Sequence, residues 1–322
     1  MAAGKEVRET LAWTWHRIVR PVLESVGAVE PVPRHEARPC IWWVPTGSFS
    51  ALPLHAAECT ALDCVEDGCG AALDAVVSSY APGLQTLAYA PARARQRDTA
   101  DHGSTLLVAA SEDDLPGMAA AAAHAAELLG AQAPLIGPAA TREAVLAALH
   151  DASWAHFGCH AATNPAEPSG ALLYLPSGEP VSVLEICRVR PRSARLAFLA
   201  ACGTARTART ARTAERLVDE AIHITSSFLL AGFPTAVGTL WKIDSTHADH
   251  MTRDFYRRTT APDSPGVART LHDTVRQLRR RIPERPHICG VRPRGGVGTP
   301  GRNTVRAGEC GAGSPAGAKP AA

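Results

Sequence analysis

The sequence lacks the long apolar runs that membrane-spanning helices require. No stretch of about 18 consecutive apolar residues occurs in the chain, so we predict no transmembrane segment and no membrane partner. The first residues also lack the pattern of a secretory signal peptide, because Lys5, Glu6, Arg8 and Glu9 interrupt them. These absences lead us to expect a cytoplasmic protein.

The net charge of the chain is likewise small. Its 33 Lys and Arg residues nearly balance its 31 Asp and Glu residues and leave a formal charge of +2, which gives no reason to expect a nucleic-acid partner. Apolar residues make up 46% of the 322 residues and charged residues 20%, as in ordinary globular proteins. A chain of this length can bury a substantial core, as one large domain or two small ones.

The nine cysteines lack the regular spacing of a small disulfide-bonded scaffold. Because no export signal is apparent, we expect them to be reduced thiols. Cys59, Cys64 and Cys69 invite comparison with a zinc site, but structural zinc sites usually have cysteine pairs about two to four residues apart and a fourth ligand. The sequence therefore predicts no metal and no cofactor.

The spacing of apolar residues along the chain becomes regular after about residue 104. Before it, the pattern predicts a helix over residues 7–27, kinked or broken at Pro21, and a strand over residues 41–44. After it, strand-like and helix-like patterns alternate. The strand-like segments are residues 106–110, 133–136, 154–160, 196–201 and 234–241. The helix-like segments are residues 115–129, 183–188, 214–231, 245–258 and 267–281, with a further helix beginning after Thr141.

This alternation predicts an α/β fold, with a doubly wound, mostly parallel sheet and helices on both faces. Two of the predicted strands end in residues suited to covalent chemistry. The run Trp154-Ala-His-Phe-Gly-Cys-His160 ends in an imidazole, and the run Leu196–Ala201 leads into the thiol of Cys202. Catalytic groups of parallel sheets lie at the carboxyl ends of strands. If the two strands are neighbours, His160 and Cys202 form a pair of general base and nucleophile.

Neighbouring residues have simpler interpretations. Alternation along a strand places Cys159 on the opposite face from His160, so we expect Cys159 to be a structural thiol. His156 shares the face of His160 but lies deeper, which favours packing, and packing is also expected for His55. No Asp or Asn that would orient His160 is identifiable from spacing.

Other parts of a candidate site follow from position. The backbone N–H groups of Cys202 and Ala161 are the simplest donors to a developing oxyanion. Asp219 and Asp244 follow the two strands nearest the predicted cleft, which makes them candidates for an acidic pocket that binds a basic substrate residue. Alternatively, Asp219 faces solvent on its helix and Asp244 caps the next helix.

Taken together, these motifs resemble the CHAT domain family, a caspase-like module. The matching segments are Trp43-Val-Pro-Thr-Gly47, Leu52-Pro-Leu-His-Ala-Ala57, Val77-Ser-Ser-Tyr-Ala-Pro82, Trp154-Ala-His-Phe-Gly-Cys-His160, Leu199-Ala-Ala-Cys-Gly-Thr-Ala205, Asp219-Glu-Ala-Ile-His223, Ala231-Gly-Phe-Pro-Thr-Ala-Val-Gly-Thr-Leu-Trp241 and Phe255-Tyr256. The resemblance implies a caspase/separase-type fold and a cysteine endopeptidase whose dyad falls on His160 and Cys202. It implies a protein or peptide substrate and is compatible with a regulatory protein partner.

Departures from the family pattern favour an alternative, a catalytically weak or inactive scaffold that acts by protein–protein interaction. Ala161 stands where the family usually has Gly, and a Thr-Ala-Arg triplet repeats after Cys202. We predict a CHAT domain over residues 10–288, with its regular α/β core at about 104–288. The Gly/Pro/Arg-rich residues 289–322 predict a disordered tail in place of the family's closing strand, and truncation after His287 should leave the melting temperature unchanged.

Overall fold

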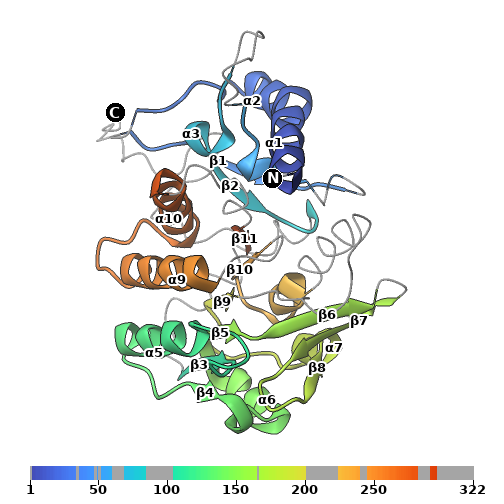
Figure 1. The fold of residues 1–322 in the computed structure, drawn as a ribbon, viewed down its shortest axis with the longest axis vertical. Coiled ribbons are helices and arrows are strands. Elements are labelled where there is room, and N and C mark those ends of the chain that lie inside the picture. Colours follow the sequence, from blue (N-terminus) through green and yellow to red (C-terminus); the bar gives the residue numbers. More distant parts are fainter. Residues whose placement is uncertain are drawn as a thin grey trace, which may run out of the picture.

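The computed structural model describes residues 2–33, 36–46, 49, 52–59, 69–84, 104–164, 167–200, 224–239, 245–281 and 291–295. These parts of the chain form a central sheet with helices on both faces, an N-terminal helical layer and a small second sheet (Figure 1). None of the described helices is both long and apolar enough to cross a membrane.

The central sheet contains eight strands in the order β1-β2-β11-β10-β9-β5-β3-β4. Their bounds are β1 Cys40–Trp43, β2 Val77–Tyr80, β3 Ser104–Ala109, β4 Leu135–Ile136, β5 Ala152–Gly158, β9 Leu196–Leu199, β10 Thr235–Thr239 and β11 Val291–Gly295. The five strands from β10 to β4 are mutually parallel, as predicted. Because β11 pairs antiparallel with β10 and parallel with β2, the strands β1, β2 and β11 run in the opposite direction.

The unbroken apolar runs of the inner strands result from burial on both sides of the sheet. Along β9, Leu196 and Phe198 pack in one hydrophobic cluster, whereas Ala197 and Leu199 pack in another. Each of these four residues is at most 2% exposed. A strand of this kind has no polar face, which is why its sequence shows no alternation.

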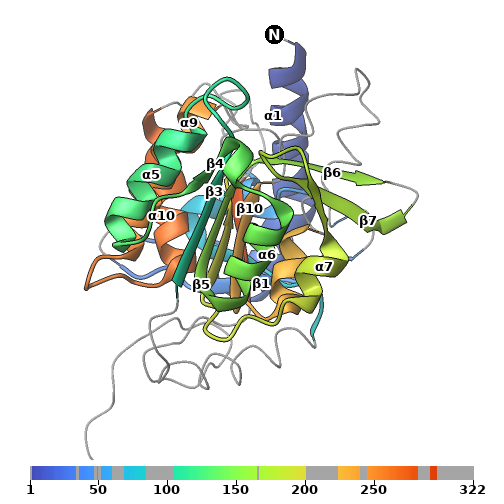
Figure 2. The same cartoon turned by 90° about the horizontal axis from the view of Figure 1, so that it is seen from below.

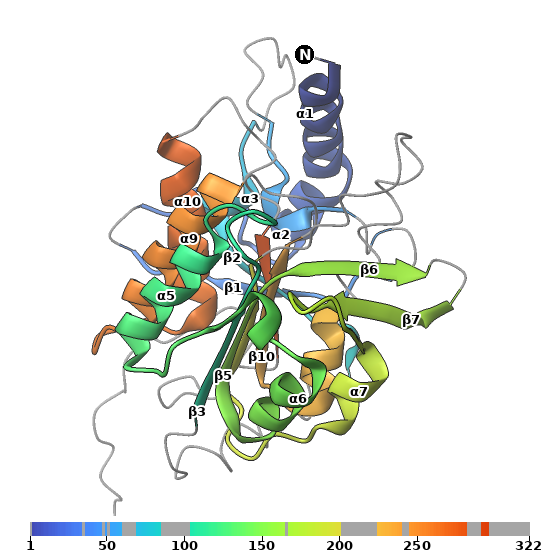
Figure 3. The ribbon, with the colours of Figure 1, turned by 60° about the horizontal axis from the view of Figure 1, so that its bottom comes forward.

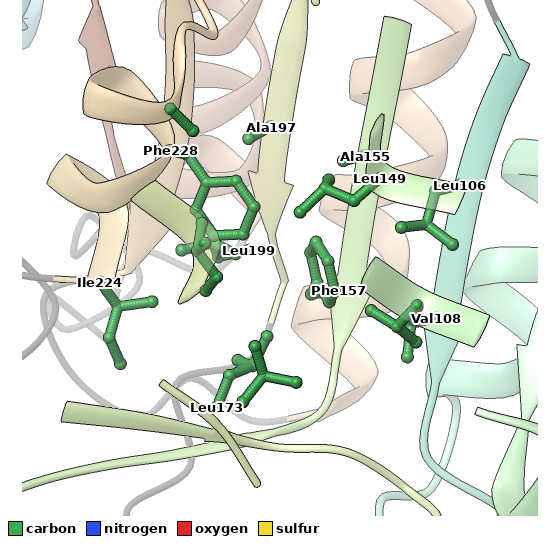
Figure 4. Close-up of a cluster of buried hydrophobic side chains, with 14 of the residues drawn as sticks. Leu106, Val108, Leu149, Ala155, Phe157, Leu173, Ala197, Leu199, Ile224 and Phe228 are labelled. Carbon is green, nitrogen blue, oxygen red and sulfur yellow. The ribbon is translucent and has the colours of Figure 1, made fainter. Parts of the chain in front are cut away.

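Helices cover both faces of the five parallel strands (Figure 2). One face is covered by α5 (Met118–Leu129) and α9 (Ser245–Thr259), and α10 (Val267–Arg281) continues this layer over β11 and β2. The other is covered by α6 (Arg142–Asp151), α7 (Val183–Arg188) and the helix of residues 224–231. On this second face, the ring of Phe157 in β5 lies 5.3 Å from that of Phe228, close to Leu173 and Leu199 (Figure 4).

The N-terminal layer is one helical segment with a wider turn in its middle. It consists of α1 (Ala2–Thr14), the π-helical η1 (Trp15–Val19) and α2 (Arg20–Ser25). Helical backbone continues through Pro21, so of the two predicted outcomes, a kink or a break, the break does not occur. The π-helical turn Trp15–Val19 comes directly before this proline, whose missing N–H group cannot donate to the preceding turn.

The layer packs on β1 and β2 through a third hydrophobic cluster that includes Trp15, Leu23, Trp43 and Tyr80. The short helices η3 (Leu54–Ala56) and α3 (Ala72–Ala75) complete this end of the sheet, and η4 (Gly137–Ala139) follows β4 at the other end.

Four charged residues, here termed the charge cluster, connect the N-terminal part of the chain to α10. Arg276 lies 2.8 Å from Asp74, and Arg279 lies 3.3 Å from Asp74 and 2.5 Å from Glu58. Burial acts to raise the pKa of the Asp74 carboxyl, but the hydrogen bond from Arg276 and the charge of Arg279 outweigh it and leave this pKa below its usual value. The cluster thus ties segments that lie some 200 residues apart in the chain.

A small antiparallel sheet lies beside the carboxyl end of β5. Its strands are β6 (His160–Asn164), β7 (Glu167–Tyr174) and β8 (Pro180–Ser182), in the order β6-β7-β8. β5 ends at Gly158 and β6 begins at His160, so the single strand predicted over residues 154–160 is divided between two sheets. Figure 3 shows β6 and β7 extending away from the helical layers.

β11 lies within the segment for which composition predicts a disordered tail. It pairs with β10 from Thr235 opposite Gly295 to Thr239 opposite Val291. The prediction is therefore wrong for residues 291–295, and the rest of that segment lies outside the described part of the chain. Composition missed the strand because strand pairing uses backbone groups, and because Pro293 would ordinarily argue against an inner strand.

The cysteines differ in part from expectation. Cys59, Cys69, Cys159 and Cys187 are reduced, as predicted. Cys40, the first residue of β1, is disulfide-bonded, so the prediction of reduced thiols is wrong at this position.

Candidate active site

The pairing of β5 with β9 determines which strand ends meet. The two strands are parallel and in register from Trp154 opposite Leu196 to Phe157 opposite Leu199. The N–H group of Ala200 continues this ladder by donating to the Phe157 carbonyl over 3.0 Å. The carboxyl ends of the two predicted active-site strands therefore lie side by side, as the sequence argument requires.

His160 lies at this edge of the sheet, three residues after Phe157. Its side chain is 30% exposed, so it is accessible from solvent but partly enclosed. Cys202, three residues after Leu199 in the sequence, lies outside the described residues, as do the candidate pocket residues Asp219 and Asp244. For these three residues the site assignment stays a prediction.

A carboxylate contacts the histidine. Nε2 of His160 lies 3.1 Å from Oδ1 of Asp114, in the turn that follows β3. Because β3 is the parallel neighbour of β5, its carboxyl end lies at the same edge of the sheet. The N–H group of Ala110 donates to the Gly158 carbonyl over 2.8 Å, which fixes the start of this turn beside the end of β5.

Internal hydrogen bonds define the turn that holds Asp114. The N–H group of Asp114 donates to the Ser111 carbonyl over 3.1 Å, and that of Gly117 donates to both carboxylate oxygens of Glu112 at 3.0 Å. Gly117 has a φ of +83°, a left-handed conformation that glycine adopts most easily. The Asp114 carboxylate thus projects from a turn of defined shape, although its side chain is 52% exposed.

The contact has a consequence for the tautomer of the imidazole. A carboxylate is a hydrogen-bond acceptor, so Nε2 must be the donor in this pair. In the neutral ring the proton is then on Nε2, and the basic lone pair is on Nδ1. The contact with Asp114 therefore restrains the His160 ring through Nε2.

Asp114 is not identifiable as a site residue from sequence spacing alone. The acidic run Glu112-Asp-Asp114 begins two residues after the apolar run of residues 106–110 ends, so it occupies the position from which strand-end side chains reach an active site. Spacing along the chain could not identify it, because β3 and β5 become neighbours only through the sheet order.

Two other histidines lie outside the site. His156 is completely buried, stacks on Phe198 with ring centroids 5.4 Å apart, and places Nδ1 3.1 Å from the Tyr256 hydroxyl. Burial lowers its pKa to about 4, so it is neutral and part of the core, as predicted. His55 is 4% exposed and contacts the Tyr80 hydroxyl at the end of β2, which lies at the opposite edge of the sheet because β2 runs antiparallel to β5.

Cys159, which precedes His160, is buried, as the sequence predicts. Cys159 is 1% exposed and belongs to the hydrophobic cluster beneath α6 and α7, so it is a structural thiol. Ala161, the proposed oxyanion donor, is 3% exposed and stands opposite Leu173 in the β6–β7 pair. That role of Ala161 stays a prediction.

Comparison with known families decides the relationship. A family model described as the CHAT domain matches residues 8–288. The chain belongs to the CHAT domain family. The CHAT match begins in α1 and extends beyond α10, and it includes the turn with Asp114, the end of β5 and the segment with Cys202. CHAT domains form a caspase-like, peptidase-related family. No curated protein matches the chain.

Proposed function

We propose that this CHAT protein is a cysteine endopeptidase in which Cys202 is the nucleophile and His160 the general base. The parallel register of β5 and β9 gives the strongest support, because it places the strand ends that precede these two residues side by side. His160 follows Phe157 by the same number of residues as Cys202 follows Leu199, and Phe157 and Leu199 are register partners.

The proposed reaction begins with proton transfer from the Cys202 thiol to Nδ1 of His160. The thiolate attacks the scissile carbonyl carbon, and the resulting tetrahedral oxyanion accepts hydrogen bonds from backbone N–H groups, in our proposal those of Ala161 and Cys202. The imidazolium then donates its proton to the leaving amine. Water hydrolyses the acyl-enzyme in a second half-reaction, with His160 again acting as base.

Asp114 has a positioning role in this proposal. By accepting a hydrogen bond from the Nε2–H group it orients the imidazole and leaves Nδ1 as the basic nitrogen, and it stabilises the imidazolium formed after proton transfer. Its side chain is half-exposed, so solvent weakens this electrostatic contribution relative to that of a buried carboxylate.

For the substrate we propose a protein or peptide with a basic residue at the cleavage site. Asp219 and Asp244 would supply the acidic pocket. If so, the arginines of the Thr-Ala-Arg repeat, Arg206, Arg209 and Arg212, form a candidate self-cleavage segment. Mass spectrometry of the purified chain after prolonged incubation tests this, and an intact segment in an active enzyme contradicts it.

One observation favours a second function, an inactive scaffold that acts through a protein partner. Ala161 replaces the glycine usual in the family and lies buried in a paired strand, so its backbone has less freedom to adapt to an oxyanion. A scaffold would keep the fold without needing an intact reaction centre.

Cleavage of a diverse peptide library, combined with labelling by a peptide-based electrophile, distinguishes the two functions. The peptidase predicts cleavage together with labelling at Cys202, and Cys202→Ala should abolish both. Cys159→Ala is the matched control, since it removes an adjacent thiol from the opposite face and should retain both. An absence of cleavage with labelling distributed over many cysteines would favour the scaffold.

A further inference from the structure

Outside the candidate active site, two thiols lie in contact within the N-terminal part of the chain. The sulfurs of Cys59 and Cys69 are 3.6 Å apart, with the Cys69 thiol donating to the Cys59 sulfur. Both residues are reduced. We propose that Cys59 and Cys69 form a redox site, which is converted to a disulfide by exchange with a low-molecular-weight disulfide of the glutathione class.

The backbone holds the two cysteines side by side. The N–H group of Cys59 donates to the Gly70 carbonyl over 2.8 Å, and Glu58 forms an antiparallel bridge with Ala71. A disulfide bond is about 2.05 Å long, so the sulfurs must approach by roughly 1.5 Å, a displacement within reach of side-chain rotation. The backbone pairing therefore does not have to open for the bond to form.

The two thiols differ in solvent exposure, and this difference determines which of them reacts first with a dissolved disulfide. Cys69 is exposed, whereas Cys59 is only 4% exposed. A dissolved disulfide can therefore reach Cys69 and not Cys59. Cys69 suits the role of attacking thiol and Cys59 the role of resolving thiol, which acts from the buried side.

The reaction is an ordinary thiol–disulfide exchange. Cys69 loses its proton to solvent and attacks one sulfur of oxidised glutathione, which forms a mixed disulfide and releases one glutathione thiolate. Cys59 then loses its proton and attacks the Cys69 sulfur, which forms the Cys59–Cys69 bond and releases the second glutathione thiolate. The two protons end on the two glutathione thiolates, so one molecule of oxidised glutathione is reduced and two protein thiols are oxidised.

The surroundings of the pair give the bond a structural consequence. Gly70, next to Cys69, lies so close to Trp15 that a Cβ atom at this position would be 2.8 Å from the indole ring. Glu58, next to Cys59, lies 2.5 Å from Arg279 of the charge cluster. The new bond would therefore join a segment packed on η1 to a segment bonded to α10, and we expect it to restrict opening of the N-terminal layer.

A redox titration of the full chain tests the proposal. The protein is equilibrated with defined ratios of reduced and oxidised glutathione, quenched with an alkylating agent, digested and mapped by mass spectrometry under non-reducing conditions. We expect a Cys59–Cys69 cross-linked peptide that accumulates as the ratio becomes oxidising and disappears on return to reducing buffer. The oxidised protein should also melt at a higher temperature than the reduced protein.

Two variants make the outcome specific. Cys69→Ser alters an exposed position, so it should fold normally, lose the cross-link and show a smaller difference in melting temperature than wild type, the remainder being due to the disulfide of Cys40. Cys187→Ser is the matched control, because Cys187 is a half-buried thiol whose sulfur contacts the Ser227 carbonyl, and this variant should behave as wild type. The proposal is overturned if Cys59 and Cys69 remain alkylated throughout the titration, if Cys69 stops at the mixed disulfide, or if it pairs with another cysteine.

Discussion

At the scale of single residues, the contact between Asp114 and His160 orients the imidazole ring in the proposed reaction. A histidine at a strand end can turn about its side-chain bonds, and only one of its nitrogens can serve the thiol. The 3.1 Å contact with Asp114 selects Nε2 as the donor. The partner comes from a turn more than forty residues earlier, so the orientation of the ring depends on the parallel contact between β3 and β5.

Substitution of Asp114 should therefore affect the chemical step more than substrate binding. We expect Asp114→Asn to lower kcat by roughly ten-fold or more, because an amide can present its N–H to Nε2 and favour the wrong tautomer. KM should change little, since the carboxylate is not proposed to contact substrate. Steady-state kinetics on a cleaved library peptide measures both constants.

Asp114→Glu is the conservative control for this substitution. It restores a carboxylate and should recover part of the lost kcat. Equal kcat values in the wild type and Asp114→Asn, in an enzyme that requires Cys202, would contradict the positioning role while leaving the peptidase assignment intact.

The proposed dyad predicts strong non-additivity. Cys202→Ala should abolish hydrolysis, and His160→Ala should lower kcat/KM by roughly three orders of magnitude or more. Because the two groups act as one unit, the double variant should be hardly slower than either single variant. The measurement is kcat/KM for all three variants together with thermal melts, which should stay close to wild type since His160 is partly exposed. Independent, multiplicative losses would contradict a concerted pair.

At the scale of elements, β11 is the strand on which the continuity of the sheet depends. It lies between β10 and β2, and among the described strands it alone joins the five parallel strands to β1 and β2. Removal of β11 would leave the facing edges of β10 and β2 without these backbone partners, which is costly for buried strands.

A pair of truncations tests this dependence. A chain ending at His287 lacks β11 and should melt several degrees below the full chain, contrary to the expectation from composition. A chain ending at Gly295 retains β11 and should melt near the full-length value. Identical melting curves for the two truncations would mean that β11 contributes nothing measurable to stability.

The comparison of β9 with β11 explains how far the sequence could predict the fold. β9 is identifiable from the sequence because burial on both faces demands an uninterrupted apolar run. Thr141 is identifiable as a helix cap because it precedes the apolar pattern of a helix, and in the structure its hydroxyl accepts a hydrogen bond from the Ala144 N–H group. β11 is held by pairing with strands that are distant in sequence, which leaves no local pattern. The same distinction between local pattern and long-range pairing applies to the residues of the candidate site. His160 and Cys202 follow recognisable strands, whereas Asp114 requires knowledge of which strands are neighbours.

At the scale of the whole molecule, two buried histidines make stability dependent on pH. Burial lowers the pKa of His156 to about 4 and that of His272 to about 3, whereas an unfolded histidine titrates near 6.5. Between these values the unfolded chain binds protons that the folded chain does not bind. The contribution to stability is therefore complete above about pH 6.5 and is lost as the pH falls toward 4, by about 3 kcal/mol for His156 alone.

Chemical denaturation at a series of pH values measures this effect. The free energy of unfolding should fall steadily from pH 7 toward pH 4. His156→Leu, which cannot titrate, should reduce the slope in this window even if it lowers stability at neutral pH. A slope unchanged by this substitution would show that His156 is not the source of the pH dependence.

The π-helical turn of η1 has a consequence for the angular phase of the N-terminal helix. The buried residues Leu11, Trp15, Val19 and Leu23 recur at intervals of four, and each is at most 2% exposed. In a regular α-helix of 3.6 residues per turn, each such interval overshoots a full turn by about 40°, so the fourth residue would be rotated by roughly 120° from the first. A wider turn in the middle offsets this drift and keeps the four side chains on one line against the sheet. Deletion of one residue from Trp15–Val19 would shorten the span from Leu11 to Leu23 to eleven residues, which overshoots three turns of regular α-helix by only about 20°, so the wider turn would become unnecessary and Leu11 would still face the core.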